Sequence, residues 1–362
     1  MKTVLMDRYT GCLLGGAVGD ALGAPIEFFG TREIQRKFGP DGLDHYIEGL
    51  GSSGVFTDDT QMTLFTAEGI LRANHRDLQK GIDGAETAII YQSYLRWLHT
   101  QGSRPARIPE GFGLYDLNSG WLITHRDLFV RKAPGITCLS ALESGKCGTI
   151  REPINDSKGC GGIMRVAPHG LFYHMDSQKA FGCACDAAAI THGHPSGYLS
   201  AGCLASIIAC VLGGQDLMAA IETTIATLRT RKNHEECLVA MEKAVALYKS
   251  VPPTPENIES LGGAWVGEET LSIALFCALH FQNDFRGGVL AAINHSGDSD
   301  STGAVTGNIL GAKLGKQAIP AEWVENLKQA DLVEEIASDL FVRVNDDSFE
   351  EDSEWAKRYP GY

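Results

Sequence analysis

Glycine recurs at every fourth position in two segments that lie near opposite ends of the chain. The first segment contains Gly11, Gly15, Gly19 and Gly23, and the second contains Gly303, Gly307, Gly311 and Gly315. On an α-helix this spacing places all four glycines on one face. Each interior glycine costs about 1 kcal/mol relative to alanine, so close packing must compensate. We therefore expect two glycine-faced helices that pack against each other at the centre of the fold.

Two acidic clusters stand where helices are expected to begin. One is Thr57-Asp58-Asp59-Thr60, and the other is Asp298-Ser299-Asp300-Ser301-Thr302 at the start of the second glycine segment. Asp, Ser and Thr cap helix starts because their side-chain oxygens accept hydrogen bonds from free backbone N–H groups. Pairing of the glycine helices would also bring Asp20 and Glu27 near Asp298 and Asp300.

The side chains of both clusters offer only oxygen ligands, which Mg²⁺ and Mn²⁺ prefer and zinc does not. Converging carboxylates would repel each other strongly without a cation. Two bridged ions would orient an oxygen-rich substrate and activate water. The alternative is that each cluster only caps its helix. The candidate metal ligands are Thr57, Asp58, Asp59, Asp298, Asp300 and Ser301.

Composition limits the classes of partner. The chain has 362 residues, 44% of them hydrophobic, and a formal charge of −14. This charge argues against nucleic acid or an anionic membrane as a partner. We find no apolar run of about 18 residues and no secretory signal at the N-terminus. The ten cysteines form no CxxC pair, which indicates reduced thiols in a cytoplasmic protein.

Helical periodicity predominates, and we find no convincing strand alternation. We expect an all-α fold with one domain over 1–344 and an acidic, solvated tail over 345–362. Two glycine-rich stretches, 31–56 and 101–160, are expected to be loops, and a long loop in a compact chain is often functional. The expected helices cover 8–24, 58–74, 84–99, 136–143, 177–191, 196–213, 215–230, 233–249, 267–282, 286–294, 321–328 and 329–341, together with the second glycine segment, whose helix is expected to begin at the acidic cluster before it.

Three further features could contact a ligand. The loop Asp156-Ser157-Lys158-Gly159-Cys160-Gly161-Gly162 is predicted to leave backbone N–H groups free for phosphate, unless it is a plain turn. His192, at a helix end, could meet phosphate or a sugar hydroxyl, or act only as a cap. Trp265 could stack on a base or belong to the core.

Taken together, these motifs resemble those of the ADP-ribosylglycohydrolase family. This family includes the dinitrogenase-reductase-activating glycohydrolases and the vertebrate ADP-ribosyl-acceptor hydrolases. The similar motifs run in the same order from about residue 8 to about 316. They are Gly19-Asp20 with Glu27, Thr57-Asp58-Asp59-Thr60, Lys158-Gly159-Cys160-Gly161-Gly162 with Met164-Arg165, Thr191-His192, and Gly297-Asp298-Ser299-Asp300-Ser301-Thr302-Gly303.

The resemblance implies a compact all-α fold with two Mg²⁺ or Mn²⁺ ions in a cleft, held by the six ligands named above. It implies a catalytic role for Glu27, Asp58 or Asp298, the general base being one of them. It also implies that His192 contacts substrate and that a loop holds the diphosphate and distal ribose. The loop residues are Asp156, Ser157, Lys158, Gly159, Cys160 and Gly161. Many relatives have asparagine in place of Cys160 and threonine in place of Ser301.

The implied activity is metal-dependent removal of ADP-ribose from a modified protein side chain, with arginine the expected acceptor, by cleavage at the anomeric carbon of the distal ribose. Charge developing in an oxocarbenium-like state would be offset by the carboxylates. The expected partner is an ADP-ribosylated protein or an ADP-ribose-containing small molecule, and we expect a monomer. Two alternatives stay open: a hydrolase of free O-acetyl-ADP-ribose or a related small molecule, and an immunity or reader protein that binds ADP-ribosylated partners.

Overall fold

The protein is a layered assembly of helices around the α1–α14 pair. The computed structural model describes residues 2–48, 53–81, 83–107, 116–346, 349–350 and 352–361. Within these ranges there is no β-strand, only one isolated bridge between Gly159 and Val266. The predicted all-α class is therefore confirmed. Parts of the segments 31–56 and 101–160 and of the acidic tail lie outside the described residues.

The described helices have the following bounds. They are α1 (Lys2–Gly23), η1 (Ala24–Ile26), α2 (Thr31–Phe38), α3 (Asp58–Lys80), α4 (Glu86–Thr100), η2 (Leu122–Thr124), η3 (Arg126–Leu128), α5 (Ile136–Glu143), η4 (Cys160–Gly162), α6 (Ala167–Phe172), α7 (Ser177–Ala189), α8 (Pro195–Leu212), α9 (Leu217–Leu228), α10 (Glu235–Tyr248), α11 (Pro255–Glu259), α12 (Gly267–His280), α13 (Phe285–Ile293), α14 (Ser299–Leu314), η5 (Lys316–Ala318), α15 (Ala321–Asn326), α16 (Ala330–Asn345) and α17 (Ser353–Arg358).

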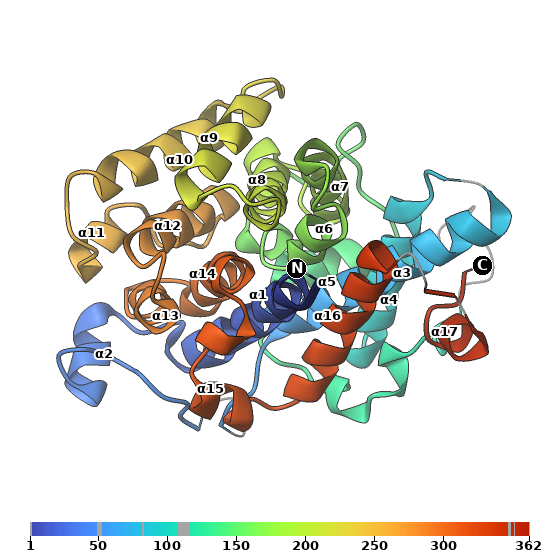
Figure 1. The fold of residues 1–362 in the computed structure, drawn as a ribbon, viewed down its shortest axis with the longest axis horizontal. Helices are drawn as coiled ribbons and strands as arrows, with labels where there is room; N and C mark the ends of the chain where they lie inside the picture. Colours follow the sequence, from blue (N-terminus) through green and yellow to red (C-terminus); the bar gives the residue numbers. More distant parts are fainter. Residues whose placement is uncertain are drawn as a thin grey trace.

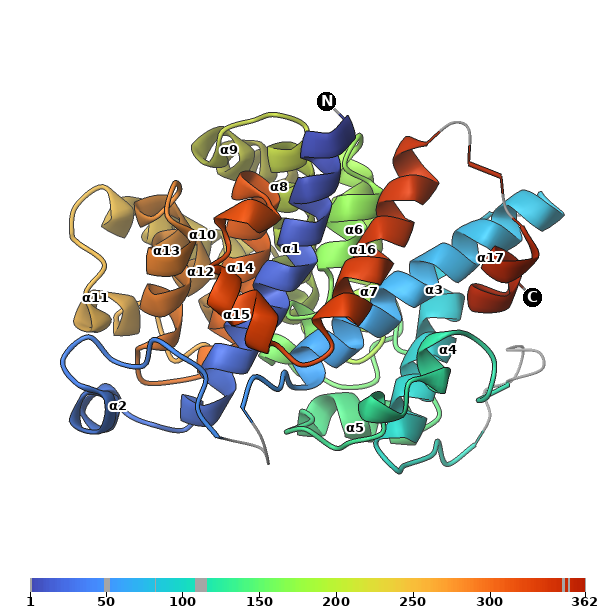
Figure 2. The ribbon, with the colours of Figure 1, turned by 60° about the horizontal axis from the view of Figure 1, so that its bottom comes forward.

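The two glycine-faced helices, α1 and α14, pack against each other in antiparallel directions. Gly15 lies opposite Gly307 and Gly19 opposite Gly303, and a Cβ added at any of the four would lie less than 3.0 Å from the facing backbone. Both helices occupy the middle of the molecule in Figures 1 and 2. The predicted central pair is confirmed, and its glycines are explained by backbone-to-backbone contact.

The other helices lie on either side of this pair. Helices α9 to α13 form one side, and α3, α4, α5 and α17 lie on the other (Figures 1 and 2). Helix α8 is as long and apolar as a membrane-spanning helix, but 94% of it is buried inside the protein. Polar and small residues such as Ser200 and Gly202 interrupt its sequence, so no continuous apolar run was visible there.

The expected helix starts are capped as predicted. The Asp59 N–H donates to Thr57 Oγ1 at 3.3 Å at the start of α3, and the Ser301 N–H donates to Asp298 Oδ1 at 3.1 Å at the start of α14. The chain bends by 93° between the segments 2–26 and 31–38. Glu27 lies at this bend, just beyond the end of the first glycine helix.

Several segments differ from the expectations, among them the short helices α6 and α11, which were not predicted. The stretch 31–56 contains the helix α2, and α3 continues to Lys80 beyond the expected end. The acidic tail is not simply solvated, because α17 buries Trp355 and its C-terminal neighbour Tyr359. The Tyr359 hydroxyl donates to Asp339 of α16 at 2.5 Å. Aromatic residues in a charged segment thus anchor it to the body of the protein.

The cysteines behave as the sequence predicted. None of the ten forms a disulfide, and seven of them are buried. Burial raises the pKa of thiols such as Cys12 and Cys277 above the ordinary range, so they remain protonated and act as small apolar groups.

A candidate metal centre in an acidic cavity

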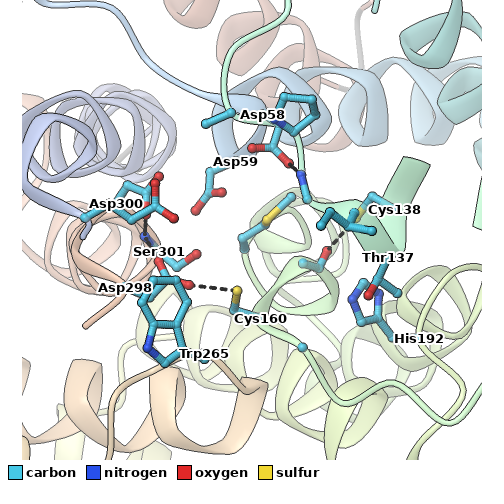
Figure 3. A pocket seen from close by; sticks show the side chains of 18 of the residues that line it. Asp58, Asp59, Thr137, Cys138, Cys160, His192, Trp265, Asp298, Asp300 and Ser301 are labelled. Carbon is cyan, nitrogen blue, oxygen red and sulfur yellow. Dashed lines mark hydrogen bonds between the residues drawn. The ribbon is translucent and has the colours of Figure 1, made fainter. Parts of the chain in front are cut away.

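The two acidic clusters converge on one cavity of about 350 Å³. Asp58 and Asp59 come from the start of α3, and Asp298, Asp300 and Ser301 come from the start of α14. Figure 3 shows these side chains on one side of the cavity and Thr137, Cys138 and His192 on the other. Among the described residues that line the cavity there is no lysine or arginine.

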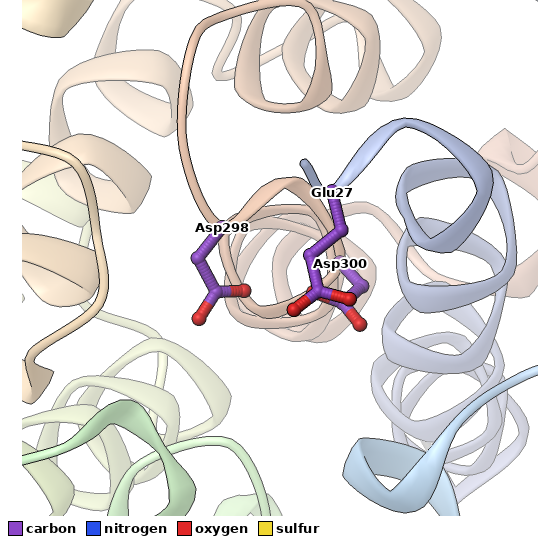
Figure 4. Close-up of side chains that lie close together, drawn as sticks. All are labelled: Glu27, Asp298 and Asp300. Carbon is purple, nitrogen blue, oxygen red and sulfur yellow. The ribbon is translucent and has the colours of Figure 1, made fainter. Parts of the chain in front are cut away.

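Glu27 completes a compact group of carboxylates with Asp298 and Asp300. One oxygen from each of the three side chains lies within 4.8 Å of the others. Figure 4 shows Glu27 reaching from the end of the first glycine helix toward the start of the second. The predicted approach of Glu27 to Asp298 and Asp300 is confirmed, and the pairing of the glycine helices produces it.

Asp20 holds the start of α3 in place. Its carboxylate accepts from the Thr57 N–H at 2.9 and 3.0 Å, from the Thr60 N–H at 3.1 Å and from the Thr60 hydroxyl at 2.6 Å. Asp20 is fully buried and does not line the cavity. It therefore stabilises the helix start that carries Asp58 and Asp59, without facing the cavity itself.

The expected ligands differ in what they contact within the protein. Asp58 Oδ2 accepts from the Gly135 N–H at 3.0 Å, and Asp300 Oδ1 accepts from the Ser301 N–H at 3.0 Å. Thr57 is buried outside the cavity lining, and its hydroxyl oxygen accepts from the Asp59 N–H at 3.3 Å. Asp59 Oδ2 is buried with no hydrogen-bond partner, and a buried acceptor of this kind requires an explanation such as a bound ion.

The carboxylates raise one another's pKa values. Burial and the neighbouring Asp300 raise the pKa of Asp20 to about 7, and burial with Asp300 and Asp58 raises the pKa of Glu27 to about 9. Burial likewise raises the pKa values of Asp58, Asp59 and Asp298 well above the ordinary range. Bound cations would compensate this accumulated negative charge. The all-oxygen donor set and the unpaired Asp59 oxygen therefore fit hard divalent ions.

Cys160 contacts the acidic group directly. Its thiol donates to Asp298 Oδ2 at 2.8 Å, a contact drawn in Figure 3. Burial, together with the Asp298 charge, raises the pKa of Cys160 well above its usual range. The thiol is therefore a donor to Asp298 and not a thiolate at neutral pH.

His192 lies at the opposite wall and is held in its neutral form. Its Nδ1 lies 2.8 Å from the Thr191 hydroxyl, which accepts from Arg165 at 2.7 Å. Burial, with the Arg165 charge, lowers the pKa of His192 to about 3. A Cβ on Gly161 would lie less than 3.0 Å from the His192 ring, so glycine allows the loop to approach it.

The loop 156–161 lies only partly in the cavity. Gly159, Cys160 and Gly161 line it, whereas Asp156, Ser157 and Lys158 do not. Asp156 is exposed, and Lys158 donates to Glu268 at 2.6 Å and also to Glu236. The ammonium group of Lys158 is thus held by these two glutamates outside the cavity lining.

The expectation of free backbone N–H groups is wrong for three positions of this loop. The Ser157 N–H donates to Asn155 Oδ1 at 3.0 Å, the Gly159 N–H to Ser157 Oγ at 3.3 Å and the Cys160 N–H to the Trp265 carbonyl at 3.3 Å. These partners satisfy the N–H groups that the sequence pattern suggested for phosphate.

Two further parts of the cavity wall were not predicted as site residues, apart from Trp265. The segment 133–138 forms one part, within the long stretch expected to be a functional loop. Phe28 forms the other with Trp265, and their rings are stacked with centroids 5.5 Å apart. Phe28 is 77% exposed and Trp265 46% exposed. Trp265 is one of the residues that the sequence suggested either as a ligand contact or as part of the core, and its exposure rules out the core, whereas Phe28 was not predicted.

Comparisons with known proteins show which family this sequence matches. The ADP-ribosylglycohydrolase family model matches residues 1–348. The chain is 26% identical to the ADP-ribosylarginine hydrolase Tri1 of Pseudomonas putida over 93% of this chain and 79% of that protein. It is 24% identical to the ADP-ribosyl-dinitrogen-reductase glycohydrolase of Rhodospirillum rubrum, with 89% and 90% covered, and 24% identical to mouse ADP-ribosylhydrolase ARH3, with 92% and 91% covered.

The fold is also found in solved structures. A chain of an ADP-ribosylglycohydrolase-related protein complex superposes with a TM-score of 0.67 at 26% identity. The match covers 94% of this chain and 98% of that one.

Proposed function

This chain belongs to the ADP-ribosylglycohydrolase family, and from that premise we propose that it is a divalent-metal-dependent hydrolase that removes ADP-ribose from modified arginine side chains. The observation that carries the proposal is the convergence of Asp58 and Asp59 with Asp298 and Asp300 in one cavity. The membership alone makes the chain an ADP-ribosyl hydrolase. The dependence on a metal and the choice of arginine as the acceptor go beyond the family membership and are part of the proposal.

Two Mg²⁺ or Mn²⁺ ions would be held by the oxygens of the two acidic clusters. The residues that would hold them are Asp58, Asp59, Asp298, Asp300 and Ser301 of the cavity lining, together with Thr57, which is buried outside that lining. When bound, the ions would supply positive charge that neutralises the carboxylates and orients an oxygen-rich sugar. The buried Asp59 oxygen without a partner supports this assignment.

Glu27 is the group that we assign to proton transfer. Its carboxylate lines the cavity beside Asp298 and Asp300 and is only partly buried, so it reaches both the ligand cluster and the open side. An attacking water must lose a proton as it bonds to the anomeric carbon and the bond from that carbon to the arginine nitrogen breaks. The Glu27 carboxylate can accept this proton if the charge of the bound ions keeps it ionised, because without them its pKa is raised to about 9. Asp58 and Asp298 flank the same space and would offset positive charge on the ribose in the transition state.

His192 and the loop residues at the other wall would bind the substrate. A neutral imidazole is able to exchange hydrogen bonds with sugar hydroxyls or phosphate without adding charge. Gly159, Cys160 and Gly161 bring the loop backbone to the same wall. No lysine or arginine lines this cavity in the described part of the chain, so the proposal assigns the diphosphate to the bound ions and to loop N–H groups other than those of Ser157, Gly159 and Cys160, which already donate within the protein.

The solvent-exposed part of the cavity wall supports the choice of arginine as the acceptor. Phe28 and Trp265 present exposed aromatic rings beside the Glu27 carboxylate. A planar cation is favoured over an aromatic face next to negative charge, and an arginine guanidinium has this shape and charge. The similarity to relatives named ADP-ribosylarginine hydrolase supports the same choice.

The test is release of ADP-ribose from an arginine-modified and a serine-modified protein, each with Mg²⁺, Mn²⁺ or EDTA. We expect release from the arginine-linked protein with either metal and none with EDTA. Faster release from the serine-linked protein would contradict the acceptor assignment. Hydrolysis of free O-acetyl-ADP-ribose without release from either protein would favour the small-molecule alternative, and binding of ADP-ribose without any hydrolysis would favour a reader.

A further inference from the structure

The turn 262–266, between α11 and α12, has an unusual backbone conformation. Gly262 has φ +131° and Ala264 has φ +62°. Alanine in the left-handed region costs roughly 1–2 kcal/mol, and such a conformation persists only where its surroundings hold it. Contacts from outside the turn must therefore stabilise it.

Glu269, in the first turn of α12, provides these contacts. Its Oε2 accepts from the Gly263 N–H at 3.0 Å and from the Ala264 N–H at 3.1 Å. A Cβ added at Gly262 would lie less than 3.0 Å from the Glu269 carboxylate, so the carboxylate lies directly against the turn. Thr270 adds a hydrogen bond from its hydroxyl to the Ala264 carbonyl at 2.8 Å.

The turn is joined to the candidate metal centre on one side. The Asp298 N–H donates to the Gly263 carbonyl at 3.0 Å. A Cβ added at Gly297 would lie less than 3.0 Å from the same carbonyl. The backbone of Asp298 is thus set by the position of Gly263, whose N–H is held by Glu269.

The turn is joined to the other wall of the cavity as well. The Cys160 N–H donates to the Trp265 carbonyl at 3.3 Å, and the Gly267 N–H donates to the Lys158 carbonyl at 2.8 Å. The Trp265 side chain itself lines the cavity. One short turn therefore links Asp298, the Cys160 loop and the aromatic pair.

We propose that Glu269 is a positioning residue for the metal centre. It does not line the cavity. Its carboxylate fixes the Gly263–Ala264 backbone, which places Asp298 for divalent-ion binding and Trp265 at the open side. The inference rests on the proposed function in assuming that Asp298 is a metal ligand.

The test compares Glu269→Ala, Glu269→Gln and Glu235→Ala in the full chain. Glu235 is an exposed glutamate in the first turn of α10, so it controls for the general effect of a negative charge at a helix start. Calorimetry with Mn²⁺ gives the affinity, and thermal unfolding in EDTA gives the stability of each variant. We expect Glu269→Ala to weaken Mn²⁺ binding by about 10- to 100-fold, as for residues that orient metal ligands.

Glu269→Gln should stay within about threefold of the original affinity, because its amide oxygen still accepts from both N–H groups. The Mn²⁺ affinity of Glu235→Ala should equal that of the unchanged chain. Unchanged Mn²⁺ affinity in Glu269→Ala, or an equal loss in Glu269→Gln, would overturn the proposal. The second result would mean that the charge matters and the hydrogen bonds do not.

Thr270→Val keeps the proposal testable if Glu269→Ala does not fold. This change retains the shape of the side chain but removes the donor to the Ala264 carbonyl, so a smaller loss of Mn²⁺ affinity is expected and an unchanged affinity would refute the positioning role. If Mn²⁺ binds and the variants behave as expected but no ADP-ribose is released, the proposed activity fails and the positioning role stands. Absence of Mn²⁺ binding by the unchanged chain would overturn both.

Discussion

Gly307 of α14 lies so close to Gly15 of α1 that a Cβ on Gly307 would come within less than 3.0 Å of the Gly15 carbonyl oxygen. The same approach repeats along the two helices, at Gly19 with Gly303 and at Gly23 with Ser299. This contact sets the distance between the bend that carries Glu27 and the helix start that carries Asp298 and Asp300. The acidic cavity therefore depends on the glycine faces.

Replacement of Gly307 by alanine should destabilise the protein. Inserting a methyl group into packed backbone costs about 1–3 kcal/mol of stability. Because the backbones of α1 and α14 approach so closely here, we expect a cost near the upper end of this range. The better helix propensity of alanine returns about 1 kcal/mol, so we expect a net loss of about 2 kcal/mol in chemical denaturation. Mn²⁺ affinity should fall as well, because α14 moves away from α1.

Gly182→Ala is the matched control. Gly182 lies within α7, and a Cβ there would meet no atom within 4 Å. This variant should gain about 0.5–1 kcal/mol of stability from helix propensity alone. Equal stability changes in Gly182→Ala and Gly307→Ala would contradict the assignment of a packing role to the glycine face.

Without divalent ions, stability should fall as pH rises. The folded-state pKa values of Asp20, about 7, and Glu27, about 9, exceed the usual carboxyl values of about 4. Such groups bind more protons in the folded than in the unfolded chain, so their contribution is complete below about pH 4 and is lost as pH rises through the raised values. The melting temperature in EDTA should therefore decrease between pH 6.5 and 9.

Saturating Mg²⁺ or Mn²⁺ should reduce this decrease, because the ions compensate the ionised carboxylates. The difference in melting temperature between metal and EDTA is the quantity to follow, and it should grow with pH. Asp300→Asn, which removes one of the interacting charges, should flatten the curve in EDTA. A metal-induced difference that does not change with pH would contradict this account of the cavity.

Loss of the aromatic pair should affect the acceptor selectively. A cation–aromatic contact contributes about 0.5–1 kcal/mol when exposed and about 2 kcal/mol when desolvated, so Phe28→Ala and Trp265→Ala should each lower kcat/KM for an arginine-linked substrate about 2- to 30-fold. A serine-linked substrate should change less than twofold. Ile136→Ala, at an 84% exposed position elsewhere on the cavity wall, should leave both substrates unchanged.

If kcat/KM fell equally for the arginine-linked and the serine-linked substrate, the aromatic pair would instead contact the ADP-ribose part that both substrates share. That result would favour stacking of Trp265 on a base, the possibility raised by the sequence, over recognition of the guanidinium group.

The features predicted from sequence were those with a local physical cause. The spacing of Gly15 and Gly19 defines a helix face whatever surrounds it, and only a second backbone can fill such a face. The Asp58 and Asp298 clusters cap helices through bonds within a few residues. The pairing of the two glycine helices predicted that Glu27 lies near Asp298 and Asp300, whereas the convergence of the Asp58 cluster on the same cavity was implied only by the family resemblance.

The features that the sequence could not supply depend on partners far along the chain. Lys158 is held by Glu236 and Glu268, and nothing near Lys158 indicates them. The Cys160 N–H is satisfied by the Trp265 carbonyl, which required the turn 262–266 to be in place. Likewise, the charge of the tail predicted a solvated segment, but Trp355 within it is buried.

The central claim is that the two acidic helix starts hold two divalent ions, and the direct measurement is the number of Mn²⁺ ions bound per chain. Calorimetry on the unchanged chain and on the double variant Asp298→Asn, Asp300→Asn would give it, with ADP-ribose release measured in parallel. We predict two ions for the unchanged chain, loss of Mn²⁺ binding in the variant, and a fall in release of about 100-fold or more, the size of effect seen when transition-state charge stabilisation is removed. Two ions retained by the double variant, or no ion bound by the unchanged chain, would contradict the account.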